Sequence, residues 1–164
     1  MSTSIFKVIT HSEEDGIKLI ERLNYIRNPL ATDMDLSYAT FVSLIYPYEE
    51  MMMVKQCYAT PANNTLQGKH FFEYVVSVPE DESYNLKSFV LCMREINNFL
   101  ASAYGKYQTI SCIHINTDNL HAHIIANNID WRNGTRFNLN LKYFHFIREE
   151  VGSILQSYGF SDIK

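Results

Sequence analysis

One segment near residue 120 restricts the fold of this chain more than any other. It contains two runs that alternate between polar and apolar residues, Cys112–Ile115 and Leu120–Asn127, and the residues between them, Asn116–Asn119, are all types that favour turns. Because strand side chains alternate between the two faces, this segment predicts an antiparallel hairpin. One face of the hairpin is apolar and is expected to enter the core; its members are Ile113, Ile115, Leu120, Ala122 and Ile124.

The polar face of the predicted hairpin gathers histidines. If Ile115 lies opposite Leu120, then His114 lies opposite His121, and His123 shares their face. Opposed Cβ atoms on paired strands are about 4.5–5.5 Å apart, close enough for imidazoles to converge on one cation. Neutral histidine ligands leave coordination positions open for a substrate oxygen or water, as a catalytic metal site requires. We therefore predict a divalent metal site at these histidines, and we expect His11, His70 and His145 to be structural or surface residues.

The rest of the chain alternates between strand patterns and amphipathic helix patterns, without repeats or linkers. A capping-box pattern at Ser12 and Asp15 indicates the start of the first helix, and Asn28-Pro29 indicates its end. The predicted strands cover residues 4–10, 70–79, 108–115 and 120–129, and the predicted helices reach about residue 27 and cover about 47–58, 86–103 and 144–158. This order predicts a single α+β domain over residues 1–164, with a largely antiparallel central sheet, helices mainly on one face and the histidines on the other.

Composition limits the function classes. Three cysteines without C-x-x-C spacing argue against a disulfide framework or a cysteine metal site and suit a reducing cytoplasm. The sequence predicts neither a secretion signal nor a membrane span, so we expect a cytoplasmic protein without a membrane partner. The net charge of −4 does not suggest a nucleic-acid binder, although the distribution of charge matters more than its sum.

The histidines occur in a spacing that resembles a known nuclease motif. His114, His121, His123 and Asn127 match the metal motif of conjugative relaxases, mobilisation nucleases of the histidine-hydrophobe-histidine endonuclease class. The segment Tyr25-Ile-Arg-Asn-Pro-Leu-Ala-Thr32 is similar to the Y-I-x-N-P-x-K-T segment of relaxases from integrative and conjugative elements, with alanine at the usual lysine. Residues 68–79 and 134–164 also resemble relaxase segments, so the likeness covers nearly the whole chain.

The resemblance implies a function. A relaxase nicks and rejoins one DNA strand at a transfer origin through a 5′-phosphotyrosine intermediate, which here would form on Tyr25. It also implies Mg²⁺ or Mn²⁺ as the working ion, and single-stranded transfer-origin DNA and accessory mobilisation proteins as partners. Since relaxases commonly continue into other domains, we expect the chain to be either the N-terminal fragment of a longer protein or a compact relative. The three histidines alone would equally accept Zn²⁺, Ni²⁺ or Co²⁺.

Other residues are candidates for supporting roles. Relaxases commonly have aspartate where this chain has Asn116, and histidine where it has Glu73. A carboxylate that accepts a hydrogen bond from a ligand histidine fixes its tautomer, and either Glu73 or Asp118 could do this, with Glu73 preferred because it lies on a predicted strand. Asn127 is a further supporting candidate. Candidate phosphate contacts are Arg27, Lys69, Arg132, Arg136 and Lys142.

Three alternative functions remain open at the level of sequence. A rolling-circle replication initiator could use the same metal and nucleophile, although a tyrosine that precedes the metal motif favours a relaxase. The chain could instead be a catalytically weakened DNA-binding module of the same fold, which the acidic charge and Asn116 favour. It could also be a zinc hydrolase that needs no tyrosine. A covalent protein–DNA product would distinguish the relaxase from the last two.

Overall fold

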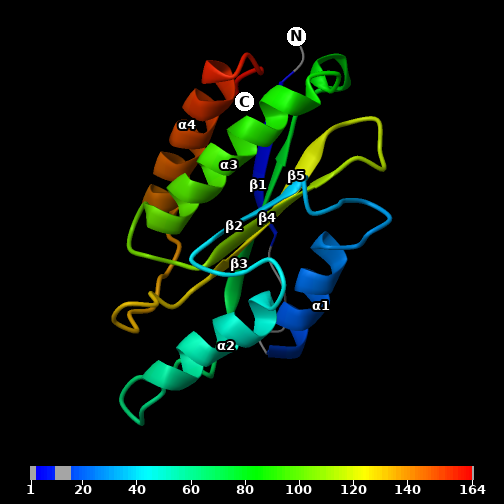
Figure 1. Cartoon of the computed structure of the whole chain (residues 1–164). Coiled ribbons are helices and arrows are strands. Elements are labelled where there is room, and N and C mark those ends of the chain that lie inside the picture. Colours follow the sequence, from blue (N-terminus) through cyan, green and yellow to red (C-terminus); the bar gives the residue numbers. More distant parts are fainter. Residues whose placement is uncertain (1–2, 10–15, 164) are drawn as a thin grey trace.

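The computed structural model describes residues 3–9 and 16–163, which form one sheet with helices on both faces (Figure 1). The described strands are β1 (Ile5–Ile9), β2 (Ser37–Thr40), β3 (Phe71–Ser77), β4 (Thr109–His114) and β5 (His121–Asn127). The helices are α1 (Gly16–Ile26), α2 (Pro47–Tyr58), α3 (Leu86–Ser102) and α4 (Leu141–Ser157), with a 3-10 turn at Glu80–Glu82. The strand order is β1-β3-β5-β4-β2, and every neighbouring pair is antiparallel. The predicted α+β fold is confirmed.

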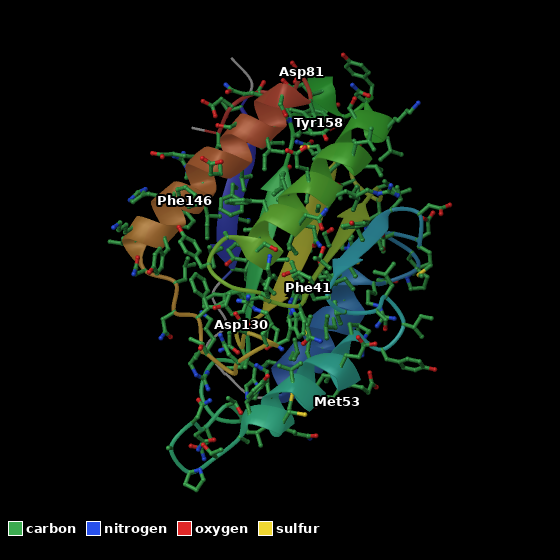
Figure 2. The ribbon with its side chains drawn as sticks, turned by 60° about the vertical axis from the view of Figure 1, so that its left-hand side comes forward. Phe41, Met53, Asp81, Asp130, Phe146 and Tyr158 are labelled. Atoms are coloured by element: carbon green, nitrogen blue, oxygen red, sulfur yellow. The ribbon has the colours of Figure 1, made fainter. Side chains whose placement is uncertain are left out.

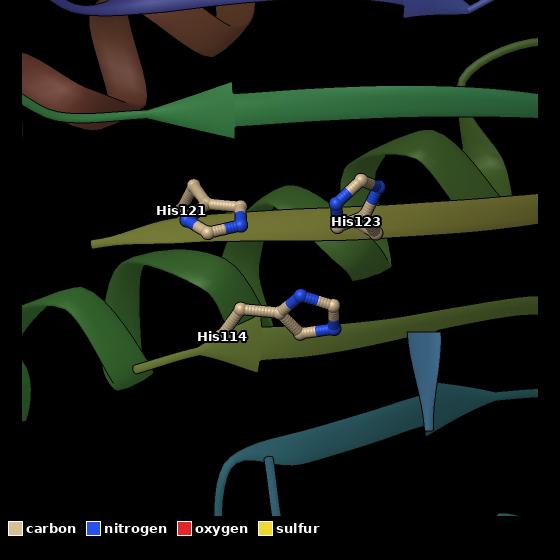
Figure 3. Close-up of side chains that lie close together, drawn as sticks. All are labelled: His114, His121 and His123. Carbon is tan, nitrogen blue, oxygen red and sulfur yellow. The ribbon is translucent and has the colours of Figure 1, made fainter. Parts of the chain in front are cut away.

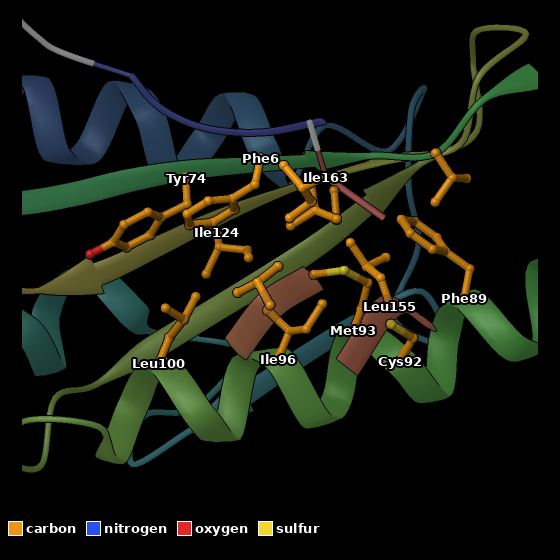
Figure 4. Packing of buried hydrophobic residues seen from close by; sticks show 14 of the residues in the cluster. Phe6, Tyr74, Phe89, Cys92, Met93, Ile96, Leu100, Ile124, Leu155 and Ile163 are labelled. Carbon is orange, nitrogen blue, oxygen red and sulfur yellow. The ribbon is translucent and has the colours of Figure 1, made fainter. Parts of the chain in front are cut away.

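The main core lies between the sheet and the two long helices. Phe89, Met93 and Ile96 of α3 pack against the sheet with Tyr74 and Ile124, and all of these side chains are nearly inaccessible to water (Figure 4). Helix α4 adds its own apolar stripe, Ile147, Val151 and Leu155, to the same cluster. This face of the sheet therefore supplies most of the hydrophobic stabilisation.

Helices α3 and α4 also contact each other at both ends of α4. Phe146 lies near the start of α4, with its ring centroid 6.1 Å from that of Phe99, and Tyr158 follows the end of α4 and donates a 2.8 Å hydrogen bond to Glu95 (Figure 2). Both helices begin with an asparagine side chain that accepts a backbone N–H, Asn85 for α3 and Asn140 for α4. The helix pair thus forms a stable layer behind the sheet.

The opposite face of the sheet carries the two shorter helices. Leu19, Leu23 and Ile26 of α1 and Met51 of α2 are fully buried in a second apolar cluster with Ile125 and its neighbours on the sheet. The expectation of helices mainly on one face holds for the long pair, while α1 and α2 share the other face with the histidines. The apolar stripe of α1 explains this, because it must be covered by some part of the sheet.

Some details differ from the sequence expectations. Strand β2 was not predicted, because four residues with the pattern Ser-Tyr-Ala-Thr give no clear alternation and the strand lies at the sheet edge. Ile115 was expected to face the core but is 50% exposed, since β4 ends at His114 and the turn begins there. The capping-box residues Ser12 and Asp15, and His11, lie outside the described residues. Among the described helices, none has the length and hydropathy needed to span a membrane.

Candidate metal and nucleophile site

The strand register brings three histidines together on the face of α1. His114 pairs directly with His121, and His123 lies two residues further along β5, opposite Cys112. The ring centroids of these histidines are 4.8–5.5 Å apart. One nitrogen from each ring lies within 4.8 Å of the others, and Figure 3 shows the rings directed toward a common space. We call His114, His121 and His123 the histidine cluster.

Each ring of the histidine cluster also faces a fixed hydrogen-bond acceptor on its outer side. His114 Nε2 lies 2.9 Å from the Ile26 carbonyl at the end of α1, and His121 Nδ1 lies 3.1 Å from the Asn119 carbonyl in the hairpin turn. His123 Nδ1 lies 3.0 Å from Glu73 Oε1. A carbonyl or carboxylate oxygen only accepts, so these nitrogens must carry the protons. The other nitrogen of each ring is then unprotonated and suited to bind a cation.

Electrostatics also favour the neutral forms of His114 and His121. Burial lowers the pKa of His114, and the neighbouring histidines and Arg22 lower it further, although the hydrogen bond to Ile26 acts in the opposite direction. Burial likewise lowers the pKa of His121, again against the effect of its backbone hydrogen bond. Neutral imidazole is the form that ligates a metal. The donor set therefore fits a divalent cation.

Tyr25 lies directly beside the histidine cluster. It is in the last turn of α1 and 47% exposed, and its ring centroid is 5.3 Å from that of His123 and 5.8 Å from that of His114. The guanidinium carbon of Arg22 lies 4.2 Å from the centroid of the Tyr25 ring. Arg22 and Tyr25 are three residues apart on one helix, so they share a face. The phenol is thus accessible to solvent and next to a permanent positive charge.

Glu73 connects the tyrosine side of the site to the histidine side. Its side chain is fully buried, and its two oxygens accept hydrogen bonds of 2.8 and 2.7 Å from Arg22 Nε and Nη2. The same Oε1 accepts from His123 Nδ1. The hydrogen bond to Glu73 is the main cause that raises the pKa of Arg22, so the guanidinium is permanently charged. One carboxylate therefore orients both a metal-site ring and the cation that contacts the phenol.

The other proposed supporting residues lie elsewhere. Asp118 is exposed in the hairpin turn, where the backbone carbonyl of Asn119, rather than the Asp118 carboxylate, accepts from His121. Asn127 is buried at the far end of β5 and donates to Met51 O at 3.2 Å and to Gln108 Oε1 at 3.0 Å. These contacts tie α2 to the sheet, so Asn127 supports the fold beneath α2 and not a histidine ring.

The five basic residues that were candidate phosphate contacts do not form one group, although Arg136 contacts the Lys69 carbonyl. Arg27 follows α1, close to Tyr25, and donates a 3.3 Å hydrogen bond to the Ile45 carbonyl. The Arg136 guanidinium donates to three backbone carbonyls, each at 2.8 Å, which gives it a structural role. Arg132 pairs with Asp130 at 2.9 Å, Lys69 has its ammonium 4.7 Å from the Phe72 ring centroid, and Lys142 is exposed at the start of α4. Among the five, Arg27 lies nearest in sequence to the site, two residues after Tyr25.

Sequence reasoning missed two cations of the site, Arg22 and Lys7. Lys7 pairs with Val75, which pairs with His123, so Lys7 lies on the histidine face of β1. Its charge is one of the smaller contributions to the lowered pKa of His121, after burial and the neighbouring His123. A signal for each existed: Arg22 precedes Tyr25 by one helical turn, and Lys7 alternates with the core residue Phe6. The chain has a net charge of −4, but Arg22 and Lys7 place positive charge close to the histidine cluster, where an anion would bind.

Comparisons with known proteins agree with this geometry. The family model "Relaxase: MobA/VirD2-like, nuclease domain" matches residues 25–160. The fold is similar to that of the MobM relaxase domain (MOBV; Mob_Pre), solved bound to 26-nucleotide pMV158 oriT DNA, with a TM-score of 0.63 at 11% identity over 99% of this chain and 90% of that one. It is also similar to a structure described as the molecular basis of vancomycin resistance transfer in Staphylococcus aureus, with a TM-score of 0.62 at 13% identity over 100% and 97%. No curated protein matches the chain significantly.

Proposed function

Because the chain belongs to the MobA/VirD2-like relaxase nuclease domain family, we propose that it nicks and rejoins one strand at a transfer origin through a 5′-phosphotyrosine on Tyr25. The observation that carries this proposal is the position of the Tyr25 ring, which lies next to the rings of His114 and His123 and also contacts the Arg22 guanidinium. An isolated surface tyrosine would have no such neighbours. The start of conjugative DNA transfer is the corresponding biological role.

We infer separate tasks for the residues of the site. The Tyr25 phenol gives up its proton as Oη attacks the scissile phosphorus and a new O–P bond forms; the bond to the 3′ oxygen breaks, and this oxygen takes up a proton. The reverse reaction rejoins the strand. Arg22 lies over the face of the Tyr25 ring, 4.2 Å from its centroid, where it holds the phenol in place and keeps a positive charge close to the reacting group. Glu73 keeps both Arg22 and His123 in orientation. A divalent ion bound by His114, His121 and His123 would polarise a nonbridging phosphate oxygen.

Substrate and metal follow from the same site. The MobM relaxase domain was solved with oriT DNA, and we infer single-stranded transfer-origin DNA as the substrate here. Lys7, on the histidine face of β1, is the cation that we propose to contact its phosphates, and Arg22 and Arg27 add positive charge close to Tyr25. We infer Mg²⁺ or Mn²⁺ as the working ion, with Zn²⁺, Ni²⁺ and Co²⁺ as competent replacements for binding. The Y-I-x-N-P segment that begins at Tyr25 supports a relaxase of the kind encoded by integrative and conjugative elements, and we propose that it works with accessory mobilisation proteins.

The observations favour catalysis over the alternatives. A weakened DNA-binding module has no need for an exposed tyrosine held against the histidine cluster or for a buried carboxylate on His123. Relaxases commonly have aspartate where this chain has the uncharged Asn116. Here the carboxylate of Glu73 accepts the hydrogen bond from a histidine of the cluster instead. A zinc hydrolase unrelated to DNA is disfavoured by the family match. A replication initiator would use the same chemistry and differs in the DNA site that it recognises.

The test is covalent capture of DNA. The protein is incubated with Mn²⁺ and a labelled single strand that spans the transfer origin of the element encoding it, and the products are analysed by denaturing electrophoresis and mass spectrometry. We expect the downstream DNA fragment to be linked through its 5′ phosphate to the peptide that contains Tyr25, a product that Tyr25→Phe abolishes while Mn²⁺ affinity and strand binding are retained. Tyr46→Phe, which changes another exposed tyrosine, is the matched control and should retain the product. Adducts on Tyr38, Tyr46 or Tyr48 would assign a different nucleophile.

A further inference from the structure

A pocket opens at Arg27, two residues after Tyr25, between the end of α1 and the loops on either side of β2. Its volume is about 330 Å³, within the roughly 300–1,000 Å³ range of pockets that hold small organic groups. Pro29, Met34 and Leu44 give it an apolar lining, and Arg27 and Thr32 add polar groups. We call it the Thr32 pocket. Its lining suits a flat ring that is apolar on its faces and polar at its edge.

Thr32 supplies a hydrogen-bonding group that the described part of the chain does not use. The residue is only 6% exposed, and its hydroxyl has no hydrogen-bond partner among the described residues. A buried hydroxyl without a partner costs free energy, so its presence indicates a missing partner. Because no hydrogen bond holds the present rotamer, rotation about χ1 can exchange the methyl group and the hydroxyl and turn the hydroxyl toward the pocket.

The charges of the Thr32 pocket favour a neutral occupant over a phosphate. Asp33 also lines the pocket, and its Oδ1 accepts backbone N–H bonds from Asp35 and Leu36 at 2.9 and 3.1 Å, which fixes a negative charge there. The Arg27 guanidinium is partly engaged by the Ile45 carbonyl at 3.3 Å. A planar guanidinium stacks on aromatic rings, and nucleobases offer such faces regardless of sequence. A nucleobase therefore fits the pocket better than the sugar-phosphate backbone.

The pocket is fixed to β4 and the residue after it, next to His114 of the histidine cluster. The Ala31 carbonyl accepts a 2.9 Å hydrogen bond from Ile115 N, the residue after His114, and the Leu36 carbonyl accepts one of 2.9 Å from Ile113 N. Arg27, on the pocket wall, follows Tyr25 by two residues. Two residues of chain span at most about 7 Å, so a strand whose scissile phosphate contacts Tyr25 has its neighbouring nucleotide within reach of the Arg27 wall of the pocket.

We propose that the Thr32 pocket receives one unpaired base next to the scissile phosphate and that the Thr32 hydroxyl hydrogen-bonds to its edge. This inference rests on the proposed function, since it names the part of the DNA substrate that the same site selects. Stacking on Arg27 and the apolar wall holds any base, and the Thr32 hydroxyl discriminates among them. A site that hydrogen-bonds a substrate group disfavours the analogue without it, because its own polar group is left unpaired.

The experiment compares base preferences with and without the hydroxyl. Proteins carrying Tyr25→Phe, so that bound strands stay intact, select from a pool of fully randomised short single-stranded DNA in the presence of Mn²⁺, and the bound strands are sequenced. We expect a preference for one base at one position, weakened about five- to tenfold by Thr32→Val, as for one lost hydrogen bond. Preferences at other positions should not change. Thr135→Val, at an exposed threonine outside the pocket, is the matched control.

A second variant covers the possibility that Thr32→Val disturbs the loop. Met34 is 61% exposed at the pocket, so Met34→Trp can fill the mouth without a core change and should remove the same base preference. Identical profiles for the parent, Thr32→Val and Met34→Trp, or no enrichment by the parent, would overturn the inference. The enriched sequence is then offered to protein that retains Tyr25. An adduct with unchanged profiles refutes only the pocket, whereas a Thr32-dependent profile without an adduct refutes only the proposed nicking.

Discussion

Replacing Glu73 by glutamine removes the negative charge that joins Arg22, beside Tyr25, to His123 of the histidine cluster. The carboxylate is fully buried and pairs with Arg22, whose side chain is 23% exposed. Loss of one partner from a fully buried ion pair costs about 3–5 kcal/mol. Water can still reach part of Arg22, and glutamine keeps one acceptor oxygen, so we expect a loss of about 2–3 kcal/mol in the free energy of unfolding. At roughly 2–4 °C per kcal/mol for a chain of this length, Tm should fall by about 4–12 °C.

The same substitution should weaken metal binding. A glutamine amide can turn its NH2 group toward His123 Nδ1, which removes the acceptor that selects the tautomer of this ring. Loss of such an outer hydrogen bond typically lowers metal affinity by about 10–100-fold. Calorimetric titration with Mn²⁺ measures this effect, and thermal unfolding followed by circular dichroism, without metal, measures the effect on stability.

Glu21→Gln provides the matched control for both measurements. Glu21 also lies on α1, but its side chain is 58% exposed and its contact with Lys18 is a 3.8 Å surface pair. Such pairs contribute about 0–1 kcal/mol, so Glu21→Gln should leave Tm and Mn²⁺ affinity nearly unchanged. If Glu73→Gln behaved like this control, with Tm and affinity at their wild-type values, the assignment of Glu73 as the link between Arg22 and His123 would be wrong.

Three further perturbations have definite expected outcomes. His121→Ala should lower Mn²⁺ affinity by more than about 100-fold in a calorimetric titration while Tm of the metal-free protein stays within about 2 °C, because the ring is only partly buried at the start of β5; unchanged affinity would remove His121 from the metal site. Lys55→Met tests a pH dependence: burial, aided by the charge of Arg136, lowers the pKa of Lys55 to about 7. The folded state then binds fewer protons than the unfolded chain between about pH 7 and 10.5. The free energy of unfolding of the wild type should therefore rise with pH in this range, by at most about 1.4 kcal/mol per pH unit. Denaturant titrations of Lys55→Met should show a smaller rise of the free energy of unfolding with pH. Arg136→Ala should lower Tm by about 4–8 °C, since three backbone carbonyls lose their donor, and equal Tm values would instead return Arg136 to the candidate DNA contacts.

The parts of the site that are local in sequence could be predicted from it. Alternation and turn chemistry within residues 112–127 are enough to place His114 opposite His121, because the hairpin connects neighbouring strands. The exposed position of Tyr25 follows from its place on the polar side of an amphipathic helix. Both predictions use spacing over one element or one turn, where few arrangements are possible.

The parts that depend on packing between distant segments could not be predicted. Glu73 was preferred as a supporting carboxylate because it lies on a strand, but its pairing with Arg22 joins residues 51 positions apart. Lys7 reaches the histidine face only because β3 lies between β1 and β5. The acceptors on His114 and His121 are backbone carbonyls, of Ile26 and Asn119, which no residue type in the sequence reveals. Strand order and backbone direction decide these contacts.

The place of β4 and β5 inside the sheet affects how the site moves. Strand β5 is bordered by β3 and β4, and β4 by β5 and β2, so separating the histidines requires rupture of hydrogen-bonded ladders on both sides. Such openings belong to the slowest and most costly fluctuations of a domain. Tyr25 stands instead on the last turn of a helix that meets the sheet through side chains, with the hydrogen bond between His114 and the Ile26 carbonyl as a link. We therefore expect the histidine cluster to be the rigid half of the site, and the last turn of α1, which carries Tyr25, to be the half that moves more easily.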